Sequence, residues 1–163
     1  MRVYLPATAA DLSAPQIGPR TAYAVTPALA RALPDEDEEA LEASAGLCAA
    51  DASLTLLAAP GAEALADRRI VIAADVGTAQ VAEPEASGDV LPGTVRVKAP
   101  VAWEAVAALL VDESAAEADV RAARTGDEEA LERAAEADLL WYDVSEREPL
   151  VAELACGPDR PSR

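Results

Sequence analysis

The run Arg-Ile-Val-Ile-Ala-Ala-Asp at residues 69–75 constrains the fold of this chain more than any other segment. Its apolar side chains are consecutive rather than alternating, so both faces of the strand that they form need cover. Such runs are typical of the interior of a sheet that has helices on both faces. We therefore predict a strand that is buried on both faces here, within an α/β or α+β fold.

Five further strands are predicted from shorter apolar or alternating runs, at residues 2–5, 21–25, 94–98, 108–112 and 138–144. Helical segments lie between them, and the clearest is residues 35–59, which opens with five acidic residues that suit the positive end of the helix dipole. We expect a single mixed sheet of about six strands covered by helices. One domain at residues 1–155 and a disordered tail at residues 156–163 are the expected organisation.

Short sequence motifs recur in the two halves of the chain. Residues 37–42 (DEEALE) return unchanged as residues 127–132, and residues 2–6 resemble residues 96–100. These matches suggest two βαβαβ-like halves related by duplication. Chance repetition in a chain so rich in Ala and Glu is the alternative.

The composition carries a genetic signature. Of the 52% of residues counted as hydrophobic, 41 are Ala, so only 43 of 163 residues have a sizeable apolar side chain. Phe, His and Asn are absent, and Lys98 is the only lysine. Residues with GC-rich codons dominate, which points to a high-GC bacterium, and we infer an actinobacterium.

Charge and missing residue types exclude several classes of function. The net charge of −17 argues against binding to nucleic acids and to anionic membranes. Without His there is no Ser-His-Asp or Cys-His catalysis, and no catalytic motif is found. The chain shows neither a run of 18 apolar residues nor a signal peptide at its start, so we expect no membrane span and a cytoplasmic protein.

Four segments carry a resemblance to a known family. MRVYLPAT, TAYAVTPAL, VIAADV and LLWYDVSE resemble a family of small acidic actinobacterial proteins that is classed as a domain of unknown function. The resemblance spans nearly the whole chain. It implies no activity, substrate or catalytic residue.

Three aspartates, Asp75, Asp112 and Asp143, each end a predicted strand. In open α/β sheets, ligands bind outside the carboxyl ends of the strands, and carboxylate oxygens suit Mg²⁺ or Mn²⁺. If the strands are parallel and adjacent, these side chains form a metal site. The alternative is that they are ordinary loop carboxylates that hydrogen-bond nearby turns.

A second set of candidates would contact a ligand or partner. Trp141 and Tyr142 point to opposite faces of one strand, so one of them can be exposed. Arg2 is an isolated cation two residues from Tyr4, on the same face of a strand. Simple core packing is the alternative for the aromatic residues, and solvent exposure is the alternative for Arg2.

Three functions remain open. The first is a non-catalytic cytoplasmic module, with no cofactor, that binds a partner, a second copy of itself or a small ligand. The second is an enzyme that uses a divalent metal, Mg²⁺ or Mn²⁺, at Asp75, Asp112 and Asp143. The third is an acidic protein that engages a basic protein partner through charge.

Overall fold

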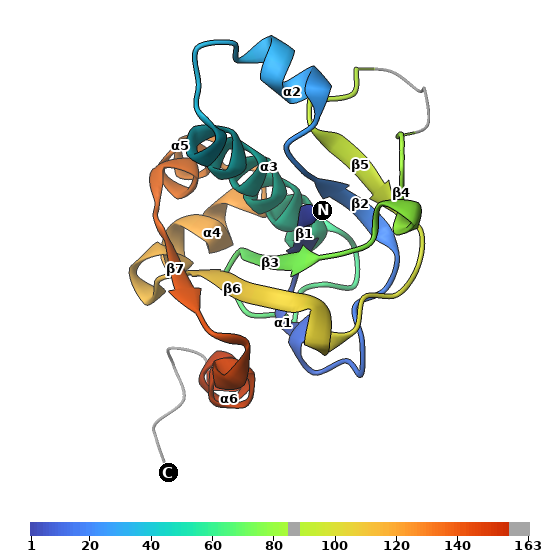
Figure 1. Cartoon of the computed structure of the whole chain (residues 1–163). Helices are drawn as coiled ribbons and strands as arrows, with labels where there is room; N and C mark the ends of the chain where they lie inside the picture. The colour runs from blue at the N-terminus through green and yellow to red at the C-terminus, as the bar shows by residue number, and fades with distance from the viewer. Residues whose placement is uncertain (85–88, 157–163) are drawn as a thin grey trace.

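Seven strands form one open sheet in the computed structural model, which describes residues 1–84 and 89–156 (Figure 1). Every neighbouring pair is antiparallel, and the order across the sheet is β4-β5-β2-β1-β3-β6-β7. The strands are β1 (Arg2–Ala7), β2 (Arg20–Tyr23), β3 (Ile70–Asp75), β4 (Val81–Ala82), β5 (Thr94–Val97), β6 (Val106–Asp112) and β7 (Leu139–Tyr142).

Helices cover both faces of the sheet. The α-helices are α1 (Ala9–Leu12), α2 (Pro27–Ala32), α3 (Glu38–Ala58), α4 (Glu117–Ala123), α5 (Glu128–Glu136) and α6 (Arg147–Ala155). The short 3-10 helices are η1 (Thr78–Gln80), η2 (Trp103–Ala105), η3 (Ser114–Ala116) and η4 (Val144–Glu146). On one face α3 packs against β1, β2 and β3, while residues of α1 and α6 join the core on the other face.

The predicted strand with two buried faces is confirmed. Ile70, Val71 and Ile72 of β3 are fully buried, and their side chains alternate between the two core layers. The α+β class and the single sheet covered by helices are confirmed as well. The prediction of a mixed sheet is wrong, because a continuous apolar run reports burial on two faces and not strand direction; helices on both faces bury an antiparallel strand equally well.

The two halves of the chain do not repeat in space. In the first half β1 lies between β2 and β3, whereas in the second half β5 lies beyond β2, far from β6 and β7. The repeated motif DEEALE has a local cause. Asp37 accepts a hydrogen bond from the Ala40 amide at the start of α3, and Asp127 accepts one from the Ala130 amide at the start of α5. The repeat therefore encodes helix capping rather than duplication.

The helix α3 has the length and composition of a membrane span, with a window of mean hydropathy 1.3 that is 44% buried in the structure. The expectation of no span rested on unbroken apolar runs, and α3 instead mixes apolar and small residues with acids. On the buried side of α3, Leu41 packs against the sheet, and Leu54 and Leu57 pack against α4 and α5. Packing in the core accounts for the buried part of this hydropathy.

The predicted tail begins at Cys156, an exposed residue just after α6. The rest of that tail, residues 157–163, lies outside the described residues.

Candidate functional site

The three candidate metal ligands do not meet. Asp112 ends β6 beside Arg69, at the start of β3, whereas Asp75 lies at the other end of β3 because the two strands are antiparallel. Asp143 follows β7 and caps η4, where its carboxylate accepts a hydrogen bond from the Ser145 amide. Within residues 1–84 and 89–156, no group of three His, Cys, Asp or Glu side chains is placed to hold a metal ion.

Asp75 and Asp112 each pair with an arginine instead. Asp75 accepts two hydrogen bonds from Arg2, at 2.7 Å from Nε and 3.0 Å from Nη2, and these bonds lower the pKa of the Asp75 carboxyl. Asp112 is fully buried against Arg69. Of the three aspartates, only Asp143 matches the alternative of a carboxylate that hydrogen-bonds a nearby turn. Asp75 and Asp112 are instead held by arginines, and the charge of Arg2 is matched by Asp75.

The Tyr4 side chain is buried on the α3 face of the sheet. Its ring packs against Gly46 of α3, and burial together with the charge of Glu42 raises the pKa of the Tyr4 phenol. Tyr4 thus belongs mainly to the core, although it also forms part of the floor of a groove.

Burial falls steadily along one row of paired residues on this face. Val71 of β3 is opposite Leu110 of β6, and Leu110 is opposite Trp141 of β7. Val71 is fully buried, Leu110 is half-buried and Trp141 is 63% exposed. Because α3 packs over β1, β2 and β3, the outer end of this row is left open.

A groove of about 520 Å³ runs beside this row, between α3, the end of α5 and the start of β7. Its apolar lining includes Leu47 of α3, which is 52% exposed, and Leu110 and Leu139 of the sheet. The ionisable side chains that line the groove, Tyr4 apart, are all carboxylates: Glu39, Glu42, Glu136 and Asp138. An apolar floor inside an acidic rim suits a basic, partly apolar chain.

The prediction that Trp141 and Tyr142 differ in exposure is confirmed. Trp141 is exposed on the α3 face, and Tyr142 is half-buried against the core of the other face. Leu47 and Leu110 were not among the predicted site residues. The sequence offers no signal for them, since their place in the groove depends on which strands α3 leaves uncovered.

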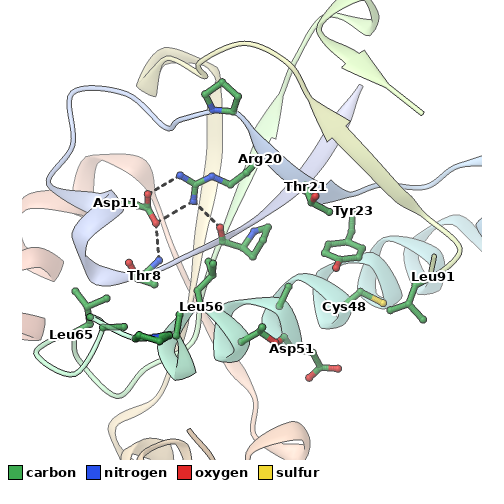
Figure 2. Close-up of a pocket in the computed structure, with 18 residues that line it drawn as sticks. Thr8, Asp11, Arg20, Thr21, Tyr23, Cys48, Asp51, Leu56, Leu65 and Leu91 are labelled. Atoms are coloured by element: carbon green, nitrogen blue, oxygen red, sulfur yellow. Dashed lines mark hydrogen bonds and ion pairs between the residues drawn. The ribbon is translucent and has the colours of Figure 1, made fainter. Parts of the chain in front are cut away.

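A larger cavity of about 900 Å³ lies on the same side of the sheet, between β2, α3 and residues 59–65. Figure 2 shows Arg20 reaching from β2 to Asp11 of α1 at one end, and Tyr23 turning its hydroxyl towards α3. Arg20 also donates to the carbonyls of Gly18 and Pro6, at 3.0 and 2.9 Å. The charge of this arginine is therefore already matched within the fold.

Polar groups of this cavity show no sign of an activated nucleophile. Burial raises the pKa of the Cys48 thiol, and the nearby Asp51 carboxylate raises it further. Burial and these two neighbours raise the pKa of Tyr23 as well. A catalytic thiol needs the opposite environment, one that favours the thiolate.

The comparison with protein families adds one result. A family model described as a family of unknown function, DUF6912, matches residues 1–151. The chain belongs to this family. The resemblance to a domain of unknown function is thereby confirmed, and it assigns no activity. No curated protein and no solved structure matches the chain.

Proposed function

We propose that this protein is a binding module that holds a basic segment of a partner protein in the groove between α3 and β7. The observation that carries the proposal is the row Val71, Leu110 and Trp141, in which burial ends at an aromatic side chain that is 63% exposed. A large exposed aromatic residue beside an apolar groove is the usual anchor of a protein interface.

The charge of the groove supports the class of partner. Four carboxylates line it, without a lining Lys or Arg to neutralise them. The whole chain carries a net charge of −17, which attracts a basic partner at long range and disfavours nucleic acids and anionic membranes. Arginine or lysine side chains would lay their aliphatic stems on Leu47 and Leu110 and place their charges at the rim.

Binding rather than catalysis is the activity that we propose for it. The pKa of the Cys48 thiol is raised, and Asp75 and Asp112 are engaged by arginines. We further propose that the protein works in the cytoplasm of an actinobacterium, where its free cysteines Cys48 and Cys156 stay reduced.

The test uses two capped hexapeptides, RVLVVR and its acidic counterpart EVLVVE, titrated into the full chain by calorimetry. We expect RVLVVR to bind, with an affinity that falls as salt rises, and EVLVVE not to bind. Trp141→Ala should weaken binding by about tenfold or more, because it removes the exposed aromatic anchor beside the groove. Equal binding of both peptides would refute the proposal.

A matched pair of charge variants locates the site. Glu42→Gln removes one carboxylate from the groove, and Glu148→Gln removes one from α6, on the opposite face of the sheet. We expect only Glu42→Gln to weaken binding of RVLVVR, by a factor of about three to five. Equal effects of the two variants would show that net charge, and not the groove, attracts the peptide.

The cavity of Figure 2 supports a second candidate, the binding of a small uncharged apolar molecule. Its volume of about 900 Å³ lies within the range of ligand pockets, and the ion pair of Arg20 with Asp11 leaves no cation for an anionic ligand. Nile red, an uncharged apolar dye, is the probe. Its fluorescence should rise with the native chain and rise less with Thr55→Trp, which places a bulky side chain in the cavity. Equal fluorescence with both would exclude the site.

A further inference from the structure

We infer that the basic segment adds to β7 as an eighth strand of the sheet, paired with residues 139–142. This inference rests on the proposed function, and it specifies how the partner is held. The observations that carry it are the open edge of β7, the exposed apolar side chains along that edge, and the aspartates that bracket it.

β7 is the last strand on one side of the sheet that the described residues form. In Figure 1, β7 borders the sheet, and no strand of the described part of the chain lies beyond it. It pairs with β6 from Leu139 to Tyr142, so alternate residues direct their backbone N–H and C=O groups away from β6. These groups are ready to pair with an added strand.

Native proteins protect such edges, and the two edges of this sheet differ in that respect. The opposite edge strand, β4, has only two residues and is followed by Glu83 and Pro84, which discourage further pairing. Within β7 the sequence Leu-Leu-Trp-Tyr contains no proline and no charge. Its Leu140 and Trp141 are 42% and 63% exposed. An unprotected apolar edge of this kind indicates an occupant.

Charge selects that occupant. Asp138 and Asp143 lie just outside the two ends of β7, and both are exposed. Hydrogen bonds from Ser145 lower the pKa of the Asp143 carboxyl, which keeps it ionised. If two copies of the chain paired antiparallel through β7, the aspartates at the end of one strand would lie near those at the opposite end of the other, and like charges close together destabilise a strand pair. A segment with arginine or lysine at each end reverses that interaction.

The same segment would reach the groove. Leu139 and Trp141 share the α3 face of β7, and Leu139 and Asp138 already line the groove. Alternate side chains of an added strand would therefore lie beside Trp141, while the other side chains lie beside Leu140 on the opposite face. One extended segment would thus pair with the outer edge of β7 and direct alternate side chains across β7 towards the groove.

The test compares RVLVVR with two backbone-methylated forms, one methylated on the amides of residues 2 and 4 and the other on those of residues 3 and 5. In an added strand only one alternate set of amides faces β7. We expect one methylated form to lose affinity by about tenfold or more and the other to bind like the parent. If both bind like the parent, the peptide docks on the face of the groove and strand addition is wrong, although the proposed function stands. If the parent does not bind, the proposed function itself fails.

Amide hydrogen exchange on the full chain gives an independent readout. Peptide binding should slow exchange of alternate amides in residues 139–142, and it should leave the amides of Val81 and Ala82 at the other edge unchanged. Unchanged exchange in β7 with bound peptide would overturn strand addition. So would a dimer, detected by light scattering without peptide, in which the same β7 amides are already protected.

Discussion

Arg69 and Asp112 form an ion pair in which the side chains are 1% and 0% exposed. The Asp112 carboxylate accepts from Arg69 Nη2 at 2.8 Å, from Nε at 2.9 Å and from the Arg69 backbone amide at 2.8 Å. Arg69 also donates to the carbonyl of Ala137, just before β7. The pair therefore joins the start of β3, the end of β6 and the approach to the exposed edge strand.

Arg69→Met should destabilise the protein by about 3–5 kcal/mol, because it leaves a buried carboxylate without its partner. The double variant Arg69→Met with Asp112→Leu should lose less, about 1–3 kcal/mol, since the backbone amide of residue 69 and the Ala137 carbonyl then lack partners but no charge is left buried. Urea denaturation of the three proteins measures this. A double variant less stable than Arg69→Met would contradict the account.

Ser53 of α3 bridges two strands. Its hydroxyl donates to the carbonyl of Ala7 at 2.6 Å and accepts from the amide of Ile70 at 3.0 Å, and the side chain is fully buried. Ser53→Ala leaves both backbone groups unpaired and should cost roughly 2–4 kcal/mol of unfolding free energy. Ser44→Ala, a half-buried serine of the same helix, is the control and should cost under about 1 kcal/mol. Similar losses for both would rule out the bridge.

Gly46 of α3 is buried against the ring of Tyr4, yet a Cβ there would meet the nearest ring atom at 3.8 Å, an ordinary contact. Gly46→Ala should therefore stabilise the protein by about 0.5–1 kcal/mol through helix propensity. Gly61 has open space around it but a φ of +89°. Gly61→Ala should destabilise by about 1 kcal/mol from backbone strain. Thermal melts compare the two, and a lower Tm for Gly46→Ala would show that the contact does not accommodate a methyl group.

The Cys48 thiol should react slowly with iodoacetamide. Burial and the Asp51 carboxylate raise its pKa, so the reactive thiolate forms only at higher pH than in the unfolded chain. In a Cys156→Ser background, the pH at which the alkylation rate rises should be higher for the folded protein than for the protein unfolded in urea. Asp51→Asn removes the repelling charge and should bring the folded profile part of the way back. If the alkylation rate of the folded protein rose at a lower pH than that of the unfolded protein, the Cys48 pKa would be lowered and this prediction would be wrong.

Metal binding gives a simple check of the rejected site. Because antiparallel pairing separates Asp112 from Asp75, millimolar Mg²⁺ or Mn²⁺ should leave the melting temperature unchanged. An increase that disappears in Asp112→Asn would restore the metal hypothesis.

Local features of this protein were determined by its sequence. The apolar run of β3 and the acidic start of α3 depend on neighbouring residues, and residues 69–75 and 35–59 predict both elements. The strand β4 was not predicted, because its two residues are too few to form a recognisable sequence pattern. Capping by Asp37 and Asp127 is likewise local, because the side chain bonds to an amide three residues away.

Only the tertiary structure decided which residues meet. Strand order and direction follow from how the helices close over the whole sheet, and no short stretch of sequence encodes them. The antiparallel order places Asp112 on Arg69 and leaves Asp75 to Arg2, which removes the predicted metal site. The same order puts β7 at an edge that α3 does not cover. Trp141, which the sequence presents as one of two candidates for exposure, is therefore exposed beside the groove.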